Sequence, residues 1–219
     1  MSEAVNAFLF VFAALFPVVN PLGGAPIFLS LTSGSSEAER NRLARGVAFN
    51  GFWLLLGSLL LGSEILEFFG ITIPVVRVAG GLLVTVMGWK LLNEDPVAAE
   101  REAVRKEARK SDINDSFYPL TMPLTVGPGA ISVALTIGSH RSAGQSFEYT
   151  LIAAAILGLV AVALSIYASY RFAGQLAKFL GKVGVNVLVR LSAFILICIG
   201  IQICWSGISA LLATLGQPA

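Results

Sequence analysis

The chain has 219 residues, of which 56% are apolar and 13% charged, and its mean hydropathy is +0.80. Soluble domains carry about 25% charged residues, so this composition excludes an ordinary soluble protein and predicts an integral membrane protein. The net charge of +2 is too small to indicate a nucleic-acid partner. Cys198 and Cys204 lie six residues apart in one apolar segment, on different helix faces, so neither a disulfide nor a metal site is expected.

Six apolar segments are long enough to cross a bilayer as helices. They cover residues 4–33, 46–69, 72–92, 117–139, 149–171 and 184–212. The first segment carries Glu3 and no Lys or Arg before its apolar run, so we expect a retained span and not a cleaved signal peptide. The sequence therefore predicts an all-α integral membrane protein with six transmembrane helices.

The first segment is interrupted by PVVNPLGGAPIF at residues 17–28. Proline in a helix interior removes a hydrogen bond and costs about 3 kcal/mol. Within a bilayer, irregular backbone is tolerated only where protein buries it or where it lines a water-filled cavity. A broken first helix beside a polar cavity near the bilayer midplane is the resulting prediction.

The stretch between the third and fourth segments, EDPVAAEREAVRKEARKSDINDS, is strongly hydrophilic. Glu102 and Lys106 have the i,i+4 spacing of an ion pair, so we expect a short solvated helix there. The predicted organisation is a first three-helix repeat at 1–93, a charged cytoplasmic linker at 94–116 and a second three-helix repeat at 117–219.

The fourth segment repeats the interruption of the first, as PLTMPLTVGPGAIS from residue 119. One constant offset of 102 residues relates Pro17, Pro21 and Pro26 to Pro119, Pro123 and Pro128. A weaker echo relates Arg77, after GITIPVV, to Arg190, after GVNVLV. Because each unit holds three spans, an odd number, the two repeats must be inverted relative to each other. Inverted repeats with broken helices in matching positions are typical of secondary transporters.

The residues at the two breaks can bind a small solute. Glycines let the backbone approach a ligand closely, and Pro26 and Pro128 suit the first turn of a restarting helix, whose free N–H groups attract a carboxylate. Asn20, Thr121 and Thr125 add neutral donors and acceptors. The candidate solute-binding residues are Asn20, Gly23, Gly24, Thr121, Thr125, Gly127 and Gly129. The candidate helix-break or hinge residues are Pro21, Pro26, Pro123 and Pro128.

The intramembrane segments lack the residues of several other mechanisms. No Asp or Glu falls well inside a span, so an acidic proton relay is not indicated, and neither a P-loop nor a catalytic triad is present. We therefore expect neither an enzyme nor a bound cofactor, and leave Na⁺ or H⁺ open as a coupling ion. Arg77 and Arg190 have two interpretations: anchors that extend toward the membrane surface, or gating residues that contact a substrate carboxylate.

Lys and Arg are strongly asymmetric between the two sets of loops. Six spans place these basic residues on one side: Arg40, Arg42, Arg45, Lys90, Arg101, Arg105, Lys106, Arg109, Lys110, Arg171, Lys178 and Lys182. The other side has Arg141, with Arg77 near a span end. Because cytoplasmic loops carry the excess of Lys and Arg, we expect these basic loops in the cytoplasm and both termini outside.

Three stretches of the chain, FPVVNPLGGAPIFLSLT, GITIPVVRVAGGLLV and PLTMPLTVGPGAIS, resemble the MarC-type family of bacterial and archaeal inner-membrane proteins. The resemblance covers nearly the whole chain and implies six spans in the inner membrane. Some members are associated with transport of small neutral amino acids such as glycine and alanine, which implies a zwitterionic substrate. The family's N-P-L-G element falls on residues 20–23 and its second-half element on residues 123–129.

The sequence and the resemblance together predict a secondary transporter of a small neutral amino acid, working by alternating access between the two repeats. Two other classes stay open. One is a small-solute channel whose constriction is formed by the two broken helices. The other is a non-transporting membrane protein that assembles or regulates a partner. The expected partners are the zwitterionic solute and the lipid bilayer, and a homo-oligomer is compatible with the sequence.

Overall fold

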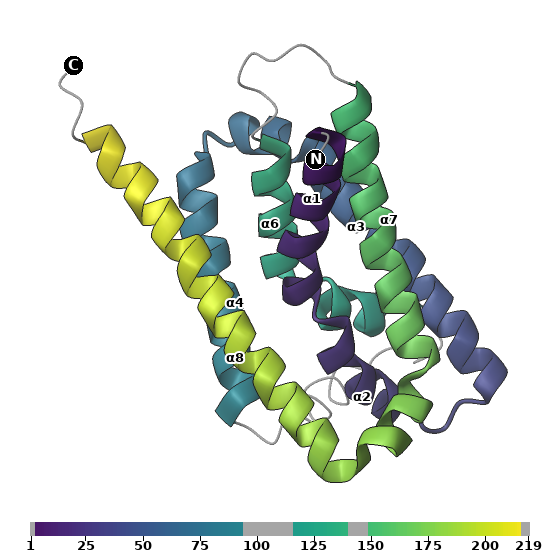
Figure 1. The fold of residues 1–219 in the computed structure, drawn as a ribbon. Helices are drawn as coiled ribbons and strands as arrows, with labels where there is room; N and C mark the ends of the chain where they lie inside the picture. The colour runs from purple at the N-terminus through teal and green to yellow at the C-terminus, as the bar shows by residue number, and fades with distance from the viewer. Residues whose placement is uncertain (1–2, 94–115, 140–148, 216–219) are drawn as a thin grey trace.

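The computed structural model describes residues 3–93, 116–139 and 149–215. In these ranges every regular secondary-structure element is a helix (Figure 1). The elements are α1 (Glu3–Val19), α2 (Pro21–Leu31), α3 (Glu37–Phe68), α4 (Ile73–Asn93), η1 (Ser116–Thr125), α6 (Pro128–Ser139), α7 (Tyr149–Arg171) and α8 (Ala173–Leu215). The predicted pair Glu102–Lys106 and Arg141 lie outside the described residues.

Four helical stretches are long and apolar enough to cross a membrane, within the ranges given above. They are Glu37–Gly62, Ile73–Asn93, Ile152–Arg171 and Val183–Ala213. Two further spans are bent pairs: α1 with α2, at 40°, and η1 with residues 128–138 of α6, at 74°. Counting each bent pair as one span gives six. The predicted all-α membrane fold with a broken first and fourth span is therefore confirmed.

Helix α3 begins at Glu37, nine residues before the predicted start of its span at residue 46. Ser36 and Glu39 form a reciprocal capping box, in which the Ser36 N–H donates to Glu39 Oε2 at 2.8 Å and the Glu39 N–H donates to Ser36 Oγ at 3.3 Å. This arrangement satisfies two backbone groups at the helix start. The segment with Arg40, Arg42 and Arg45, which the sequence suggested as a loop, therefore forms the first turns of α3.

The helix that contains the sixth span is longer than the span itself, because α8 begins at Ala173 and not near residue 184. Gly181 interrupts it with φ 63° and ψ 177°, a conformation that glycine adopts without steric cost. The apolar part after this kink, Val183–Ala213, matches the predicted span closely.

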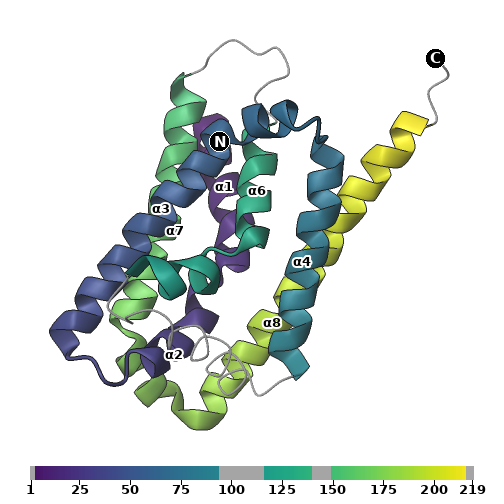
Figure 2. The same cartoon turned by 180° about the vertical axis from the view of Figure 1, so that it is seen from behind.

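Helices α4 and α8 form an antiparallel pair that runs along one side of the molecule (Figures 1 and 2). Glycines allow their backbones to touch. A Cβ added at Gly81 would clash with the backbone of Gly200 and Cys204, and one added at Gly88 would lie 2.9 Å from the carbonyl oxygen of Ala193. Small residues at such contacts are the usual basis of helix packing in membranes.

The remaining helices share one apolar core. Helix α1 packs on α7, α3 packs on both α6 and α7, and η1 packs on α3. Leu15, Leu55, Leu59, Leu159 and Val162 are all essentially inaccessible to solvent in this core. Large apolar side chains on α4 and α8, including Trp89 and Trp205, are exposed. An apolar exterior of this kind is expected of helices that face lipid.

The C-terminal end of α2 is held by an arginine from the next helix. The Arg40 guanidinium donates from Nη2 to the Thr32 carbonyl oxygen at 3.1 Å and from Nε to Thr32 Oγ1 at 3.2 Å. Thr32 is fully buried, and its hydroxyl donates to the Phe28 carbonyl oxygen at 2.8 Å. A cation at this position satisfies carbonyls that the helix leaves unpaired and interacts favourably with its dipole.

Arg40→Gln is therefore expected to lower the free energy of unfolding by about 1–2 kcal/mol, because the end of α2 loses a partly buried cation. The measurement is the thermal unfolding midpoint in detergent micelles, followed by circular dichroism. Arg42→Gln removes an exposed charge two residues away and is the matched control. Equal shifts in the two variants would contradict the capping role of Arg40.

Candidate solute site at the two helix breaks

The first break is a single residue, Asn20, between α1 and α2. Its backbone is left-handed, with φ 49° and ψ 57°, and its side-chain oxygen accepts a hydrogen bond from the Gly23 N–H at 3.2 Å. Asparagine tolerates this conformation, and an Asn cap followed by Pro21 is a favourable helix start.

The predicted restart of this helix at Pro26 was wrong. Pro21 occupies the first turn of α2, whereas Pro26 is buried inside the helix. The reason is the Asn20 cap, which begins the new helix five residues earlier than the proline spacing suggested. Gly23 and Gly24 consequently lie in the first turn of α2 and not in an unwound segment.

The second break is wider than the first. Inside η1, Tyr118 and Met122 have extended backbone, and each precedes a proline across a cis peptide bond. The next regular helix, α6, begins at Pro128 as predicted. Met122 occupies the position related to Asn20 by the 102-residue offset, and its thioether sulfur is too weak an acceptor to replace the Asn20 side-chain oxygen as a helix cap. The same proline spacing therefore produces two different breaks.

Tyr170, near the end of α7, connects the two broken spans. Its side chain is fully buried, and its hydroxyl lies 2.8 Å from Thr125 Oγ1. The Thr125 hydroxyl donates to the Leu120 carbonyl oxygen at 2.7 Å, so the proton between the two hydroxyls comes from Tyr170. On the other side, the Tyr170 ring stacks on Phe28 of α2, with 4.4 Å between ring centroids.

Because Gly24 has no side chain, the Tyr170 hydroxyl can pack directly against its backbone. A Cβ added at Gly24 would lie 2.8 Å from the Tyr170 hydroxyl oxygen, with the nearest ring carbon at 3.5 Å. We call the group formed by Gly24, Phe28, Thr125 and Tyr170 the Tyr170 junction. At this junction, one residue of α7 contacts both interrupted spans.

The structure brings together only part of the predicted site. Six of the seven candidate solute-binding residues are buried: Gly23, Gly24, Thr121, Thr125, Gly127 and Gly129. Among these, Gly24 and Thr125 meet at the Tyr170 junction, whereas half-buried Asn20 is bonded locally to Gly23. Thr121 donates locally to the Ser116 carbonyl oxygen at 2.7 Å.

The other candidates face elsewhere. Gly129 packs against Val84 of α4, and the nearest side chain to Gly127 is that of Met87, also on α4. Pro123 and Pro128 are exposed. Arg77 is half-buried on α4, while Arg190 is exposed on α8. Their predicted gating or anchoring roles stay predictions.

Sequence reasoning missed Tyr170. The segment Tyr170-Arg171 ends the predicted fifth span, where aromatic and basic residues commonly mark the membrane interface. Nothing local distinguishes a buried Tyr from an interfacial one, because the distinction depends on which helices pack against α7. The full burial of Tyr170 and its contact with both breaks identify it as a functional candidate.

The junction offers neutral hydrogen-bonding groups. Its polar atoms are two hydroxyls and a peptide carbonyl. Three residues after Thr125, α6 begins at Pro128, and the N–H groups of buried Gly129 and Ala130 in its first turn lack intrahelical acceptors by position. Within the described ranges, no cluster of three or more His, Cys, Asp or Glu side chains could hold a metal ion. Such a set suits a small neutral or zwitterionic molecule.

Known proteins resemble the chain over nearly its whole length. It is 33% identical over 205 residues to the UPF0056 inner membrane protein MarC of Escherichia coli O1:K1 / APEC, with 91% of this chain and 93% of the relative covered. It is 32% identical, with the same coverage, to the protein of that name from Salmonella typhimurium strain LT2. No solved structure matches the chain.

The match to the family itself is equally broad. Residues 5–212 match the family described as MarC family integral membrane protein. The relatives are inner-membrane proteins by name, and the chain has the apolar helices that such a location requires. The resemblance inferred from the proline motifs is confirmed, and the chain belongs to the MarC family of integral membrane proteins.

Proposed function

We propose that the chain is a secondary transporter of a small neutral amino acid, such as glycine or alanine, that works by alternating access. The observation that carries this proposal is the Tyr170 junction, where buried Tyr170 bonds Thr125 in one broken span and packs on Gly24 in the other. Secondary transporters bind their substrates where the broken helices of their two repeats meet.

The pairing of the helices supports the proposal of two inverted units. Helix α1 packs on α7 as α3 packs on α6, and α4 packs on α8. Let α1–α2, α3 and α4 form one unit, equivalent in that order to η1–α6, α7 and α8 of the other. Exchanging the two units then turns the α1–α7 contact into the α3–α6 contact and leaves the α4–α8 contact unchanged. Such an arrangement allows one unit to tilt against the other around the breaks.

The chemistry at the breaks favours a small zwitterion as the substrate. The positive end of the α6 dipole and the Gly129 and Ala130 N–H groups suit a carboxylate. Tyr170 and Thr125 supply neutral hydroxyls at the Tyr170 junction. In the arrangement seen here Tyr170 fills the space against Gly24, so solute entry requires the junction to open. We propose that this opening is part of the transport cycle.

The proposed orientation follows the basic residues. The N-terminal end of α3 and the C-terminal end of α7 lie together, joined by an ion pair between Arg171 and Glu37 with 3.4 Å between Nη1 and Oε1. Arg40, Arg42 and Arg45 lie at the same end of α3. We propose that this end faces the cytoplasm and that both termini lie outside.

Liposomes loaded with unlabelled alanine should accumulate labelled alanine or glycine by counterflow when they contain the protein. Thr125→Val is expected to slow this exchange about tenfold, because Tyr170 loses its buried hydrogen-bond acceptor and the solute loses a polar contact. The measurement is the initial rate of saturable uptake at matched protein density.

Ser58→Ala is the matched control for the lost hydroxyl, because the Ser58 hydroxyl donates to the Leu54 carbonyl oxygen of its own helix, at 2.7 Å. It should exchange at the wild-type rate. Flux without exchange would indicate a channel in place of the carrier. Absence of any flux from correctly inserted protein would reject the amino-acid assignment and favour a partner-binding role.

A further inference from the structure

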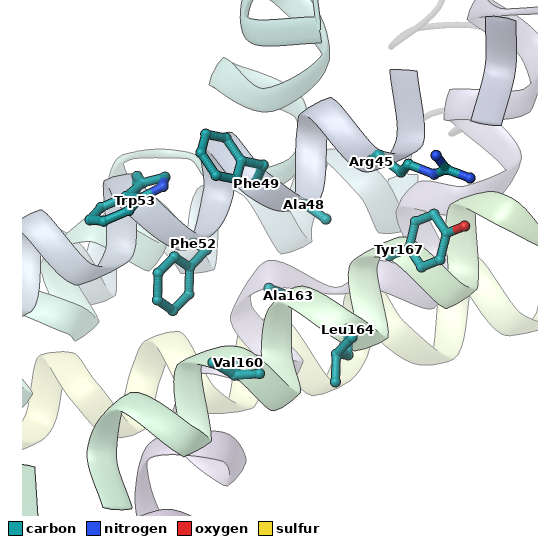
Figure 3. A pocket seen from close by; sticks show the side chains of 9 residues that line it. All are labelled: Arg45, Ala48, Phe49, Phe52, Trp53, Val160, Ala163, Leu164 and Tyr167. Carbon is teal, nitrogen blue, oxygen red and sulfur yellow. The ribbon is translucent and has the colours of Figure 1, made fainter. Parts of the chain in front are cut away.

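An open groove of about 550 Å³ runs between α3 and α7 on the outer surface of the bundle (Figure 3). Its walls are apolar, with Phe49, Phe52 and Trp53 on α3 and Val160 and Leu164 on α7. Because this face of the protein is in the membrane-spanning region, the groove opens toward lipid and not toward water.

One end of the groove is polar. Arg45 of α3 and Tyr167 of α7 close it, with the guanidinium and the phenol at the same end in Figure 3. Arg45 is exposed, and no ion pair to it is seen among the described residues. Arg171, further along the same end, is already paired with Glu37. Arg45 is therefore the cation placed to receive an anion above the groove.

We infer that this groove binds one anionic phospholipid, with an acyl chain along the apolar walls and the phosphate on Arg45 and Tyr167. The aromatic and branched side chains suit a flexible hydrocarbon chain, while a guanidinium pairs with phosphate through two parallel hydrogen bonds and a phenol adds a third donor. The groove thus has both features of a lipid site: a long apolar wall and a phosphate-binding end.

Charge argues against two alternatives. A second copy of the chain packed through the same groove would bury Arg45 against a lining that holds no carboxylate, which is costly. A small neutral amino acid has neither the length to use the apolar walls nor the net charge to use Arg45. The site is separate from the Tyr170 junction, so the inference does not depend on the proposed transport activity.

The chain allows a direct fluorescence test, because Trp53 lines the groove and the other two tryptophans, Trp89 and Trp205, are exposed on α4 and α8. With those two changed to Phe, the protein is placed in phosphatidylcholine nanodiscs containing a small fraction of brominated phosphatidylglycerol or, separately, brominated phosphatidylcholine. Bromine atoms on the acyl chain quench a tryptophan that they touch.

Brominated phosphatidylglycerol should quench Trp53 more strongly than brominated phosphatidylcholine at the same mole fraction. Arg45→Gln should reduce that preference about fivefold, as expected for one cation acting on an anionic lipid near the membrane surface. Arg42→Gln removes an exposed charge that does not line the groove and should keep the preference. Circular dichroism of both variants checks that each is folded.

Three results would overturn the inference. Equal quenching by the two brominated lipids would show a non-selective lipid-facing surface. A phosphatidylglycerol preference that persists in Arg45→Gln would place the charged contact elsewhere. Absence of quenching by either lipid, together with a dimeric mass for the nanodisc-embedded protein, would show that a second copy covers the groove.

Discussion

Gly81→Ala is expected to destabilise the protein by about 1–3 kcal/mol, because α4 and α8 touch through their backbones at this glycine. The added Cβ would clash with the backbone of Gly200 and Cys204, which cannot rotate away as a side chain would. The two helices must separate along their length to admit it. The measurement is the thermal unfolding midpoint in detergent micelles, with the yield of folded protein as a second readout.

Gly57→Ala is the matched control, since Gly57 lies in α3 with no atom within 4 Å of the position of an added Cβ. Alanine there reduces the conformational freedom of the unfolded chain and should stabilise the protein by about 0.4–1 kcal/mol. The two Gly→Ala changes should therefore shift the midpoint in opposite directions. A shift in the same direction would contradict the close approach of α4 and α8.

Much of this fold could be predicted from local features of the sequence. Span lengths follow from runs of apolar residues, and proline has no N–H and constrains its neighbours wherever it occurs. Both broken spans were accordingly expected, and both are present. These features need no knowledge of which helices touch each other.

Two helix starts, those of α2 and α3, differ from the prediction because of side chains that cap helices. Ser36 and Glu39 have the spacing of a capping box, and Asn20 followed by Pro21 has the composition of a helix start. Both signals were present in the sequence. The charged residues after Ser36 suggested a loop in place of the first turns of α3, and the proline repeat suggested that α2 starts at Pro26 and not at Pro21. The repeat predicted equivalent breaks, whereas the change from Asn20 to Met122 at equivalent positions makes them differ.

The Tyr170 junction could not be predicted, because it depends on three residues from separate elements meeting in space. Gly24, Thr125 and Tyr170 are 45 or more residues apart along the chain. Their contact follows from the packing of α7 against both α2 and α3, which no local pattern specifies. Residue type and position made Gly24 and Thr125 candidate solute-binding residues. Only the tertiary structure shows that the Tyr170 side chain connects them.

Gly24→Ala, Tyr170→Phe and the double variant form a cycle that tests this connection. Gly24→Ala alone should destabilise the protein by about 1–3 kcal/mol, because its Cβ would lie 2.8 Å from the Tyr170 hydroxyl oxygen. Tyr170→Phe alone should cost about 1 kcal/mol, since the buried hydrogen bond to Thr125 is lost. Both are measured as shifts in the thermal unfolding midpoint.

The double variant should be no less stable than Tyr170→Phe alone. Once the hydroxyl oxygen is removed, the atoms nearest to the added Cβ are ring carbons at 3.5 and 3.6 Å, which is ordinary van der Waals contact. The stability changes of the two substitutions are therefore expected to be strongly non-additive, as is usual for substitutions at residues in direct contact. Gly174→Ala, whose Cβ would meet only the Leu29 side chain at 4.0 Å, controls for the general effect of alanine.

The same cycle separates packing from transport when counterflow is measured beside stability. If opening of the junction is a step of the cycle, Gly24→Ala should slow exchange, and the double variant should recover the rate of Tyr170→Phe. Additive losses in stability would mean that Tyr170 does not press on Gly24. Coupled stability with unchanged counterflow in every variant would leave the junction as a packing contact and move the solute path away from the two helix breaks.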